Sequence, residues 1–426
     1  MNDRQSAFKI LNKIEKDKAY TNLALDAYLR TNAETVYSSS FVTALVYGVT
    51  ERLITLDWVL SKYLQKPLKK LKPEVLTILR LGAYQLKFMD SVPASAAVNE
   101  SVKLAKQNGC SFASGLVNSV LRKVASDALD YPETDDPVYN MSIRYSCPYD
   151  LAAHYCADYG TENAEGILSH SIGKQEIFAR VNTLKTDFDK LKSSFEKDGI
   201  EISPCKEVEN HFRFKTHCSV ESLPQFADGL FHVQDISSAL CVKSLELDGN
   251  MTLIDICSAP GGKTFTAAEY MRNSGTIYAF DLYEHRVKLV RQGAKRLGIG
   301  IISAEQHDAL KVKDGLTGIA DRVLCDVPCS GLGVIGRKPE IRYKDLSSID
   351  KLTQTQYNIL INASGYLKHG GLLVYSTCSL NKAENEGVCD RFLSQNPQFT
   401  KHRDYITLFP HINNSDGFFI AVFRRT

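Results

Sequence analysis

Long apolar segments, an excess of one charge and internal repeats are all missing from this chain of 426 residues. No apolar run approaches the roughly 20 residues that a membrane-spanning helix needs, so the sequence predicts no membrane segment. The 51 Lys and Arg residues nearly balance the 49 Asp and Glu residues, and a formal charge of +2 neither requires nor excludes a nucleic-acid partner. With 44% hydrophobic and 23% charged residues, the composition excludes wholesale disorder and a coiled coil. It predicts an ordinary water-soluble protein of two or three domains.

The start of the chain shows no secretory leader, and the 11 cysteines are an odd number. Both observations predict a reducing, cytoplasmic location, because secreted proteins usually pair their cysteines. In that compartment a cysteine is by default a small buried apolar residue. A role as metal ligand or nucleophile needs separate evidence.

The first 125 residues predict a bundle of helices. Apolar side chains recur there at spacings of three and four residues, as on the buried face of a helix, and Pro73 suits a first helical turn. The stripes are Phe8-Leu11-Ile14, Phe41-Leu45-Val49, Leu53-Leu56-Leu60, Val75-Leu79-Ala83-Leu86 and Val117-Val120-Leu121-Val124. The basic run at residues 66–72 is either a phosphate contact or a solvated loop, and both interpretations stay open.

Residues 126–136 are polar with little apolar periodicity, which predicts a linker and a domain boundary. We therefore expect three parts: residues 1–125, residues 126–240 with the linker, helices and a small α+β module, and residues 241–426. Within the second part, residues 151–168 and 188–197 predict helices, and residues 177–181, 200–203 and 212–214 predict strands.

From residue 245 onward, short apolar runs alternate with segments of helical length, as buried parallel strands do. The runs are residues 253–256, 277–280, 322–325 and 372–375. They predict a Rossmann-like, doubly wound α/β sheet, in which ligands bind at the carboxyl ends of the strands. The residue clusters that suggest a binding or catalytic site all follow the carboxyl end of one of these strands.

The loop at residues 257–264, Cys-Ser-Ala-Pro-Gly-Gly-Lys-Thr, lies between the first strand and a predicted helix. Its adjacent glycines let the backbone approach a ligand and leave amide donors free at the helix start. A P-loop NTPase is disfavoured, because Cys257 stands where that motif needs glycine and Pro260 lacks an amide hydrogen. The loop predicts a different nucleotide-like ligand.

Two aspartates follow the next strands in register with this loop. Asp281 ends the second strand, where an acidic side chain accepts ribose hydroxyls, and Asp308 closes the expected third strand, where it would meet an adenine. Either residue alone is explained as a helix N-cap. Together with the glycines they predict an adenosine ligand without phosphates.

Two cysteines follow the fourth and fifth strands. Cys329 lies in Asp326-Val327-Pro328-Cys329-Ser330-Gly331, and Cys378 lies in Ser376-Thr377-Cys378-Ser379. Both are expected to face the same crevice as the adenosine ligand. A zinc site is the first rival, but Cys325 and Cys329 have no second close pair of cysteines or histidines, so no metal is predicted.

These motifs resemble the RNA cytosine-5 methyltransferases, which use S-adenosylmethionine. The resemblance rests on residues 257–264, 326–331, 376–379 and Glu384-Asn385-Glu386, and continues at residues 180–185, 233–235 and 416–421. Residues 117–122 resemble the antitermination factor NusB. The combination is similar to methyltransferases of small-subunit (16S) ribosomal RNA. It implies an all-α NusB-like bundle, a small α+β RNA-binding module and a Rossmann-like catalytic domain.

The resemblance also implies roles for matching residues. Cys378 is the implied nucleophile that adds to C6 of cytosine, because C5 is a poor nucleophile until a thiolate has added. Cys329 assists the release step, and Asp326, at least partly protonated, holds the N3 edge of the base. The implied cofactor contacts are Cys257, Ser258, Ala259, Pro260, Gly261, Gly262, Lys263, Asp281, Asp308 and Asp326.

Three positions qualify the resemblance. Ser258 replaces a common alanine, and Leu240 stands where the family often has glutamine. Lys263 supports either the cofactor loop or the charge of the pocket.

RNA is the expected partner of a monomeric protein, with phosphate contacts from Arg122, residues 66–72, Arg180 and Lys185. One alternative is the same chemistry on transfer RNA or large-subunit ribosomal RNA. Another is a non-catalytic RNA-binding module, which predicts loss of Cys378 or of the glycine loop, and both are present.

Overall fold

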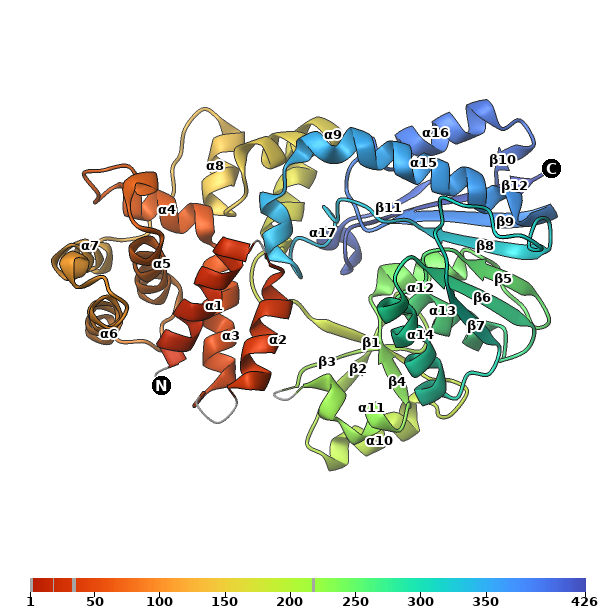
Figure 1. The fold of residues 1–426 in the computed structure, drawn as a ribbon, viewed down its shortest axis with the longest axis horizontal. Coiled ribbons are helices and arrows are strands. Elements are labelled where there is room, and N and C mark those ends of the chain that lie inside the picture. Colours follow the sequence, from red (N-terminus) through yellow and green to blue (C-terminus); the bar gives the residue numbers. More distant parts are fainter. Residues whose placement is uncertain (1–2, 18, 33–35, 217–218) are drawn as a thin grey trace. The chain divides into compact units, whose positions relative to one another are not determined.

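The computed structural model describes residues 3–17, 19–32, 36–216 and 219–426. By packing, the chain divides into two compact units (Figure 1). The helical unit comprises Met1–Gly173 and Ile335–Lys344, and the sheet unit comprises Lys174–Val334 and Asp345–Thr426. Within the described residues, no helix is long and apolar enough to cross a membrane.

The helical unit confirms the bundle predicted from the apolar stripes. Its helices are α1 (Asp3–Asp17), α2 (Thr21–Thr31), α3 (Ser39–Glu51), α4 (Leu53–Ser61), α5 (Pro73–Phe88), α6 (Ala94–Gln107), α7 (Ser114–Ser126), α8 (Pro137–Arg144) and α9 (Tyr149–His170), with 3₁₀ turns at Leu68–Lys70, Ser111–Ala113 and Pro339–Tyr343. Val75, Leu79 and Ala83 of α5 are buried as their spacing predicted, and Pro73 occupies the first turn. The sequence pattern missed α2 and α6, whose buried faces consist largely of alanine and other small residues.

Packing divides the chain differently from the expected bounds at residues 125 and 240. Residues 127–136 are irregular as predicted, and Asp136 caps α8 by accepting hydrogen bonds from the Val138 and Tyr139 amides at 2.9 and 3.0 Å. However, α8 and α9 belong to the helical unit. The hydroxyl of Thr55 on α4 donates to the Ile143 carbonyl at 2.6 Å, so this linker does not separate two compact units.

A segment from much later in the chain completes the helical unit. Arg342 is 1% exposed, and its guanidinium donates to the Tyr145 carbonyl at 3.0 Å, to the Ser171 carbonyl and to the Ser171 hydroxyl at 2.9 Å. Backbone carbonyls therefore solvate a buried cation. The chain leaves the sheet unit after Val334, makes these contacts and returns at Asp345.

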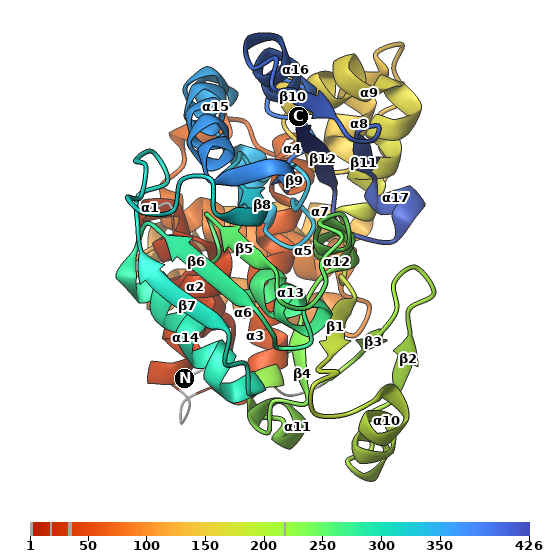
Figure 2. The ribbon, with the colours of Figure 1, turned by 90° about the vertical axis from the view of Figure 1, so that its right-hand side faces the viewer.

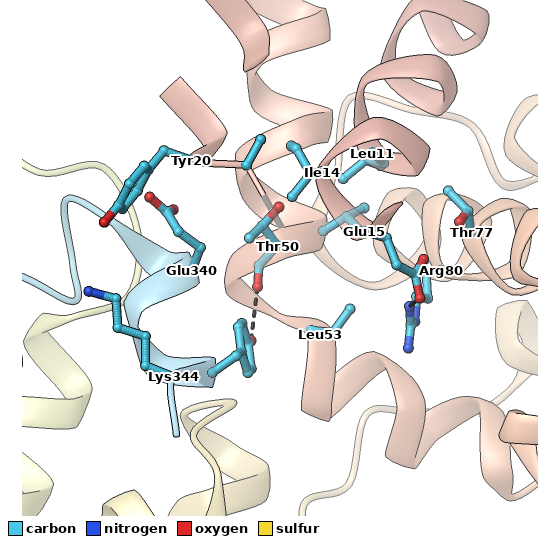
Figure 3. A pocket seen from close by; sticks show the side chains of 13 residues that line it. Leu11, Ile14, Glu15, Tyr20, Thr50, Leu53, Thr77, Arg80, Glu340 and Lys344 are labelled. Carbon is cyan, nitrogen blue, oxygen red and sulfur yellow. Dashed lines mark hydrogen bonds and ion pairs between the residues drawn. The ribbon is translucent and has the colours of Figure 1, made fainter. Parts of the chain in front are cut away.

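The same segment forms one wall of a cavity of about 490 Å³ in the helical unit (Figure 3). Leu11, Ile14 and Leu53 give it an apolar lining. Tyr343 also lines the cavity, and its hydroxyl donates to the Thr50 carbonyl at 2.9 Å. Arg80 also lines the cavity, but Asp57 accepts both of its hydrogen bonds at 2.7 Å.

The small module of the sheet unit has four antiparallel strands in the order β2-β3-β1-β4. Its elements are β1 (Ile177–Val181), α10 (Phe188–Lys197), β2 (Ile202–Pro204), β3 (His211–Phe214), α11 (Pro224–Ala227) and β4 (Phe231–Val233), with a 3₁₀ turn at Val220–Ser222. Phe195 packs against Phe212 and Phe231, with ring centroids 6.0 and 5.5 Å away. The α+β prediction is confirmed. Strand β4 was not predicted, although the equally short β2 was.

The large sheet has the strand order β10-β12-β9-β8-β5-β6-β7, with β11 added beside β12 (Figure 2). Strands β5 to β9 run parallel to one another, and β12 runs antiparallel to β9. The strands are β5 (Thr252–Asp255), β6 (Thr276–Asp281), β7 (Ile302–Gln306), β8 (Ala320–Asp326), β9 (Leu367–Thr377), β10 (Phe399–Lys401), β11 (Ile406–Leu408) and β12 (Phe418–Arg425). The helices are α12 (Ile236–Lys243), α13 (Gly262–Tyr270), α14 (Glu284–Leu297), α15 (Ile349–Gly365), α16 (Glu386–Gln395) and α17 (Pro410–Asn413), with a 3₁₀ turn at Leu346–Ser348.

Alternation along the strands builds two cores, one on each face of this sheet. Leu253 and Ile277 pack in one core with α12, α13 and α14, whereas Ile254 and Phe280 pack in the other with α15 and α16. Both faces are thus covered, which confirms the predicted doubly wound, Rossmann-like arrangement.

We predict that Arg342→Ala lowers the free energy of unfolding by roughly 2 to 3 kcal/mol, because it leaves buried carbonyls without a donor. Urea denaturation monitored by circular dichroism measures this effect. Lys338→Ala, in the same segment but exposed, is the matched control and should be nearly neutral. A loss below about 0.5 kcal/mol for Arg342→Ala, the size of an ordinary surface change, would contradict the structural role.

Candidate active site

The candidate site lies where the parallel strands of the large sheet end. Strand β5 has β6 on one side and β8 on the other, so the direction of chain progression reverses between β5 and β8. Such a reversal opens a crevice at the carboxyl ends of the strands. The loops after β5, β6, β8 and β9 carry the predicted residues to this edge.

Gly261 shapes the loop after β5. Its φ is 112°, a left-handed value, and a Cβ there would lie 2.3 Å from the ring of Phe265. Only glycine fits both conditions. The next residue, Gly262, begins α13. The backbone amides of this turn therefore point outward from the N-terminal end of the helix, where the sequence predicts a nucleotide-like ligand.

Ser258 fastens this loop to the neighbouring strand. Its amide and its hydroxyl both donate to the Phe280 carbonyl, at 2.7 and 3.0 Å. An alanine at this position would keep only the hydrogen bond from the backbone amide. The serine that departs from the family pattern therefore adds one hydrogen bond between the loop and β6. Cys257, next to it, is not a reactive thiol here, because burial raises its pKa well above the usual value.

Asp281 ends β6 and contacts the same loop. One carboxylate oxygen accepts from the Ala259 amide at 3.3 Å and lies 3.3 Å from the Arg286 guanidinium. Arg286 in turn donates to the Ala259 carbonyl at 2.7 Å. The structure thus brings Asp281 to the loop, as the sequence predicted. Its contact with a ribose stays a prediction.

Asp308 lies two residues beyond the end of β7 and is half-buried. Its carboxylate accepts from the Leu310 amide at 3.0 Å, so it caps its own turn. This is the N-cap-like role that the sequence left as an alternative. Its contact with an adenine is likewise only a prediction.

Asp255, the last residue of β5, is a site residue that the sequence analysis did not single out. It is 1% exposed, and one oxygen accepts from the Thr264 hydroxyl at 2.6 Å. The other oxygen has no hydrogen-bond partner among the described residues. Burial, above all, raises the pKa of Asp255 to about 7, although Thr264 acts in the opposite direction. Its position directly before the glycine loop was the available signal.

Lys263 reaches across to Asp326 at the end of β8. Its ammonium lies 2.8 Å from one carboxylate oxygen, and the Ser376 hydroxyl donates to the other at 2.7 Å. Burial alone would lower the pKa of Lys263, but the charge of Asp326, the hydrogen bond to it and the charges of Cys241 and Cys378 together raise it. Lys263 therefore offsets the charge of Asp326 in the pocket.

The two predicted cysteines are in contact. Cys329 follows β8 and Cys378 follows β9, and their sulfurs are 3.2 Å apart. The hydrogen bond with Cys378 and burial raise the pKa of Cys329 well above its usual value. The backbone also joins the loops, because the Gly333 amide donates to the Cys378 carbonyl at 2.9 Å. Two thiols within hydrogen-bond distance can share a proton.

One expected RNA contact is wrong. Arg180 is 2% exposed and donates to Glu269 at 3.0 Å, so it stabilises the interior and cannot meet a phosphate. Lys185 donates to the carbonyls of Asp228 and Arg296, both at 2.8 Å, but its side chain is exposed, and its contact with a phosphate stays a prediction. Sequence position alone could not reveal these partners, which lie far along the chain. Arg122 and the basic residues 66–72 remain predictions.

Among the residues that the structure describes, no three His, Cys, Asp or Glu side chains are grouped so that they could hold a metal ion.

Comparisons with known proteins cover both units. The family described as "16S rRNA methyltransferase RsmB/F" matches residues 242–424, and the NusB family matches residues 1–126. A probable ribosomal RNA small subunit methyltransferase B of Bacillus subtilis is 34% identical over 441 residues, 99% of this chain and 98% of the relative. One from Synechocystis sp. is 33% identical over 443 residues, 99% of each. The crystal structure of PH0851 shares 25% identity over 99% of this chain and 98% of its own, with a TM-score of 0.82.

We predict that Asp255 makes the ligand-free protein less stable as pH rises. Its pKa in the folded state, about 7, exceeds the ordinary value of 3.8. The folded state therefore binds more protons between these values, and stability falls as pH rises through about 4 to 8, by on the order of 4 kcal/mol in total. Asp255→Asn should remove this slope.

The measurement is urea denaturation of both proteins across that pH range. The difference between the two profiles is decisive, because other groups act oppositely: burial lowers the pKa of His211 to about 4, which makes stability rise with pH. Parallel profiles for the wild type and Asp255→Asn would show that Asp255 titrates normally.

Proposed function

This chain belongs to the 16S rRNA methyltransferase RsmB/F family and is a ribosomal RNA methyltransferase, and we propose that it methylates C5 of a cytosine in small-subunit RNA. We further propose S-adenosylmethionine as methyl donor and a covalent bond from Cys378 to cytosine C6. The observation that carries this proposal is the contact of Cys329 and Cys378 beside the Lys263–Asp326 pair.

The residues after β5 and β6 fit an adenosine-containing donor. The turn at Gly261 leaves helix-start amides free, and Asp281 supplies a carboxylate at the second strand end. The unpartnered oxygen of Asp255 suits a donor group such as an amine. When bound, the cofactor supplies an electrophilic methyl on sulfur.

In the proposed addition step, the Cys378 thiolate forms a bond to C6, and the displaced electron pair makes C5 nucleophilic. Negative charge then develops on the base. Lys263, kept cationic by Asp326, stabilises that charge electrostatically. Asp326 binds the N3 edge of the base, a role that needs a proton between its carboxylate and N3.

In the proposed release step, the C5 proton leaves, its electron pair restores the C5–C6 double bond and the bond from C6 to sulfur breaks. Cys329 is the thiol that lies against Cys378, at 3.2 Å, and it assists this step. In the free site the hydrogen bond to Cys378 and burial raise the pKa of Cys329, so Cys329 is a thiol. It gives its proton to the departing Cys378 sulfur and takes up the proton from C5.

The same chemistry on transfer RNA or large-subunit RNA is the second candidate. The NusB match at residues 1–126 and the small-subunit names of the relatives favour small-subunit RNA. Bisulfite mapping of 5-methylcytosine across total RNA, with and without this protein, separates the two. A cytosine that loses its mark only in transfer RNA or large-subunit RNA would overturn the substrate assignment.

Asp281→Ala should weaken S-adenosylmethionine binding by roughly ten- to a hundredfold, because a charge-assisted hydrogen bond contributes about 1.5 to 3 kcal/mol. Isothermal titration calorimetry measures the dissociation constants. Asp248→Ala, at an exposed carboxylate, is the matched control. Unchanged affinity in a folded Asp281→Ala protein, or tight ATP binding by the wild type, would refute the cofactor site.

The two cysteines should give unequal phenotypes. Cys378→Ala should abolish methylation and form no covalent RNA complex, because the attacking thiolate is missing. Cys329→Ala should still add to the base but release it slowly, so that protein linked to methylated RNA accumulates in denaturing gels. Thermal melts check that both variants fold. Trapping by Cys378→Ala would reverse the assignment, and full activity of both variants would exclude cysteine chemistry.

A further inference from the structure

Glu384 is a fully buried carboxylate that none of the steps above uses. It lies in the loop between β9 and α16, is 0% exposed and accepts hydrogen bonds on both oxygens. One oxygen accepts from the Ser330 amide at 2.8 Å and from Gln356 at 2.9 Å. The other accepts from the hydroxyls of Ser330 at 2.5 Å and Ser379 at 2.7 Å.

The donors come from three separate elements. Ser330 follows Cys329 directly, Ser379 follows Cys378 directly, and Gln356 belongs to α15. The two serine hydroxyls also lie 2.7 Å from each other. Glu384 therefore joins the residues next to both cysteines and fixes them to a helix.

A carboxylate suits this position for a physical reason. Buried charge is costly unless several donors satisfy it, and here four donors converge on two oxygens. Removal of the acceptor would take one partner from the Ser330 amide, from both serine hydroxyls and from Gln356, which also donates to the Pro328 carbonyl at 3.0 Å. The loops are then free to shift toward other acceptors.

The loop of Cys378 has a second, independent support. Asn385 accepts from the Thr377 hydroxyl at 2.6 Å and donates to the Ser379 carbonyl at 2.9 Å. These bonds bracket Cys378 without using Glu384. What Glu384 adds is a side-chain connection from this loop to the loop of Cys329, beside the backbone bond from the Gly333 amide to the Cys378 carbonyl.

We infer that Glu384 is a positioning residue that holds the Cys329 sulfur against the Cys378 sulfur. The spacing itself does not depend on what the protein methylates. Its consequence for release rests on the proposed function: without Glu384 the addition by Cys378 persists, whereas the assistance by Cys329 fails. Misplacement by about 1 Å can cost about a hundredfold in rate.

Glu384 also acts on Cys329 electrostatically. After the hydrogen bond to Cys378, burial and the charge of Cys378, its negative charge contributes to raising the pKa of Cys329. Glu384→Gln separates the two effects. The glutamine oxygen can accept from the Ser330 amide and Gln356, and its amide can donate to the two hydroxyls, so the connection survives while the charge is lost.

The spacing can be tested without RNA by titration with phenylarsine oxide, which condenses with two adjacent thiols and releases one water molecule. Cys329→Ala gives the background from other cysteines. Glu384→Ala should bind the arsenical at least about tenfold more weakly than the wild type, and Glu384→Gln should remain within about threefold. Wild-type binding by a folded Glu384→Ala protein would overturn the inference.

A second variant keeps the test valid if Glu384→Ala does not fold. The double variant Gln356→Ala with Ser379→Ala leaves only the Ser330 donors and should weaken arsenical binding in the same direction. Gln354→Ala, two residues earlier on α15 and exposed, is the matched control and should bind like the wild type. No weakening in the double variant would overturn the inference as well.

With RNA present, Glu384→Ala should accumulate covalent protein–RNA complex as Cys329→Ala does, and should add nothing in the Cys329→Ala background. A parallel loss of methylation and of complex would mean a general structural role and would overturn the positioning role. If the wild type forms no 5-methylcytosine, the proposed function fails, while the arsenical titration still decides the spacing.

Discussion

The site depends on one geometric constraint: parallel strands deliver the residues that follow them to a single edge of the sheet. Strands β8 and β9 are paired in register from Arg322 to Asp326, so the loops that follow them start side by side. The sulfurs of Cys329 and Cys378 consequently meet at 3.2 Å although the residues are far apart in sequence.

At the carboxyl edge of the parallel strands, each acidic side chain has its partners within hydrogen-bond distance. Lys263 offsets Asp326, while four neutral donors satisfy Glu384. Asp255 accepts a hydrogen bond from the Thr264 hydroxyl on one oxygen, and burial raises the pKa of its carboxyl to about 7. The three acids at this edge thus differ in their partners.

Much of this was predictable, because short continuous apolar runs and strand-end motifs are local properties of a sequence. Strands β5, β6, β8 and β9, the glycine loop and both cysteine turns follow from such patterns. The burial of Arg180 and Arg342 was not predictable, since each depends on acceptors from distant segments. The same holds for Glu384, which the family motif contained but whose four donors only the folded chain brings together.

The central claim is that Cys378, and not Cys329, bonds to cytosine. The most direct measurement is mass spectrometry of the covalent complex formed by Cys329→Ala with RNA, after digestion of both protein and RNA. The account predicts a peptide containing Cys378 that carries a methylated cytidine. A cytidine on any other residue, or a linked nucleotide other than cytidine, would contradict it.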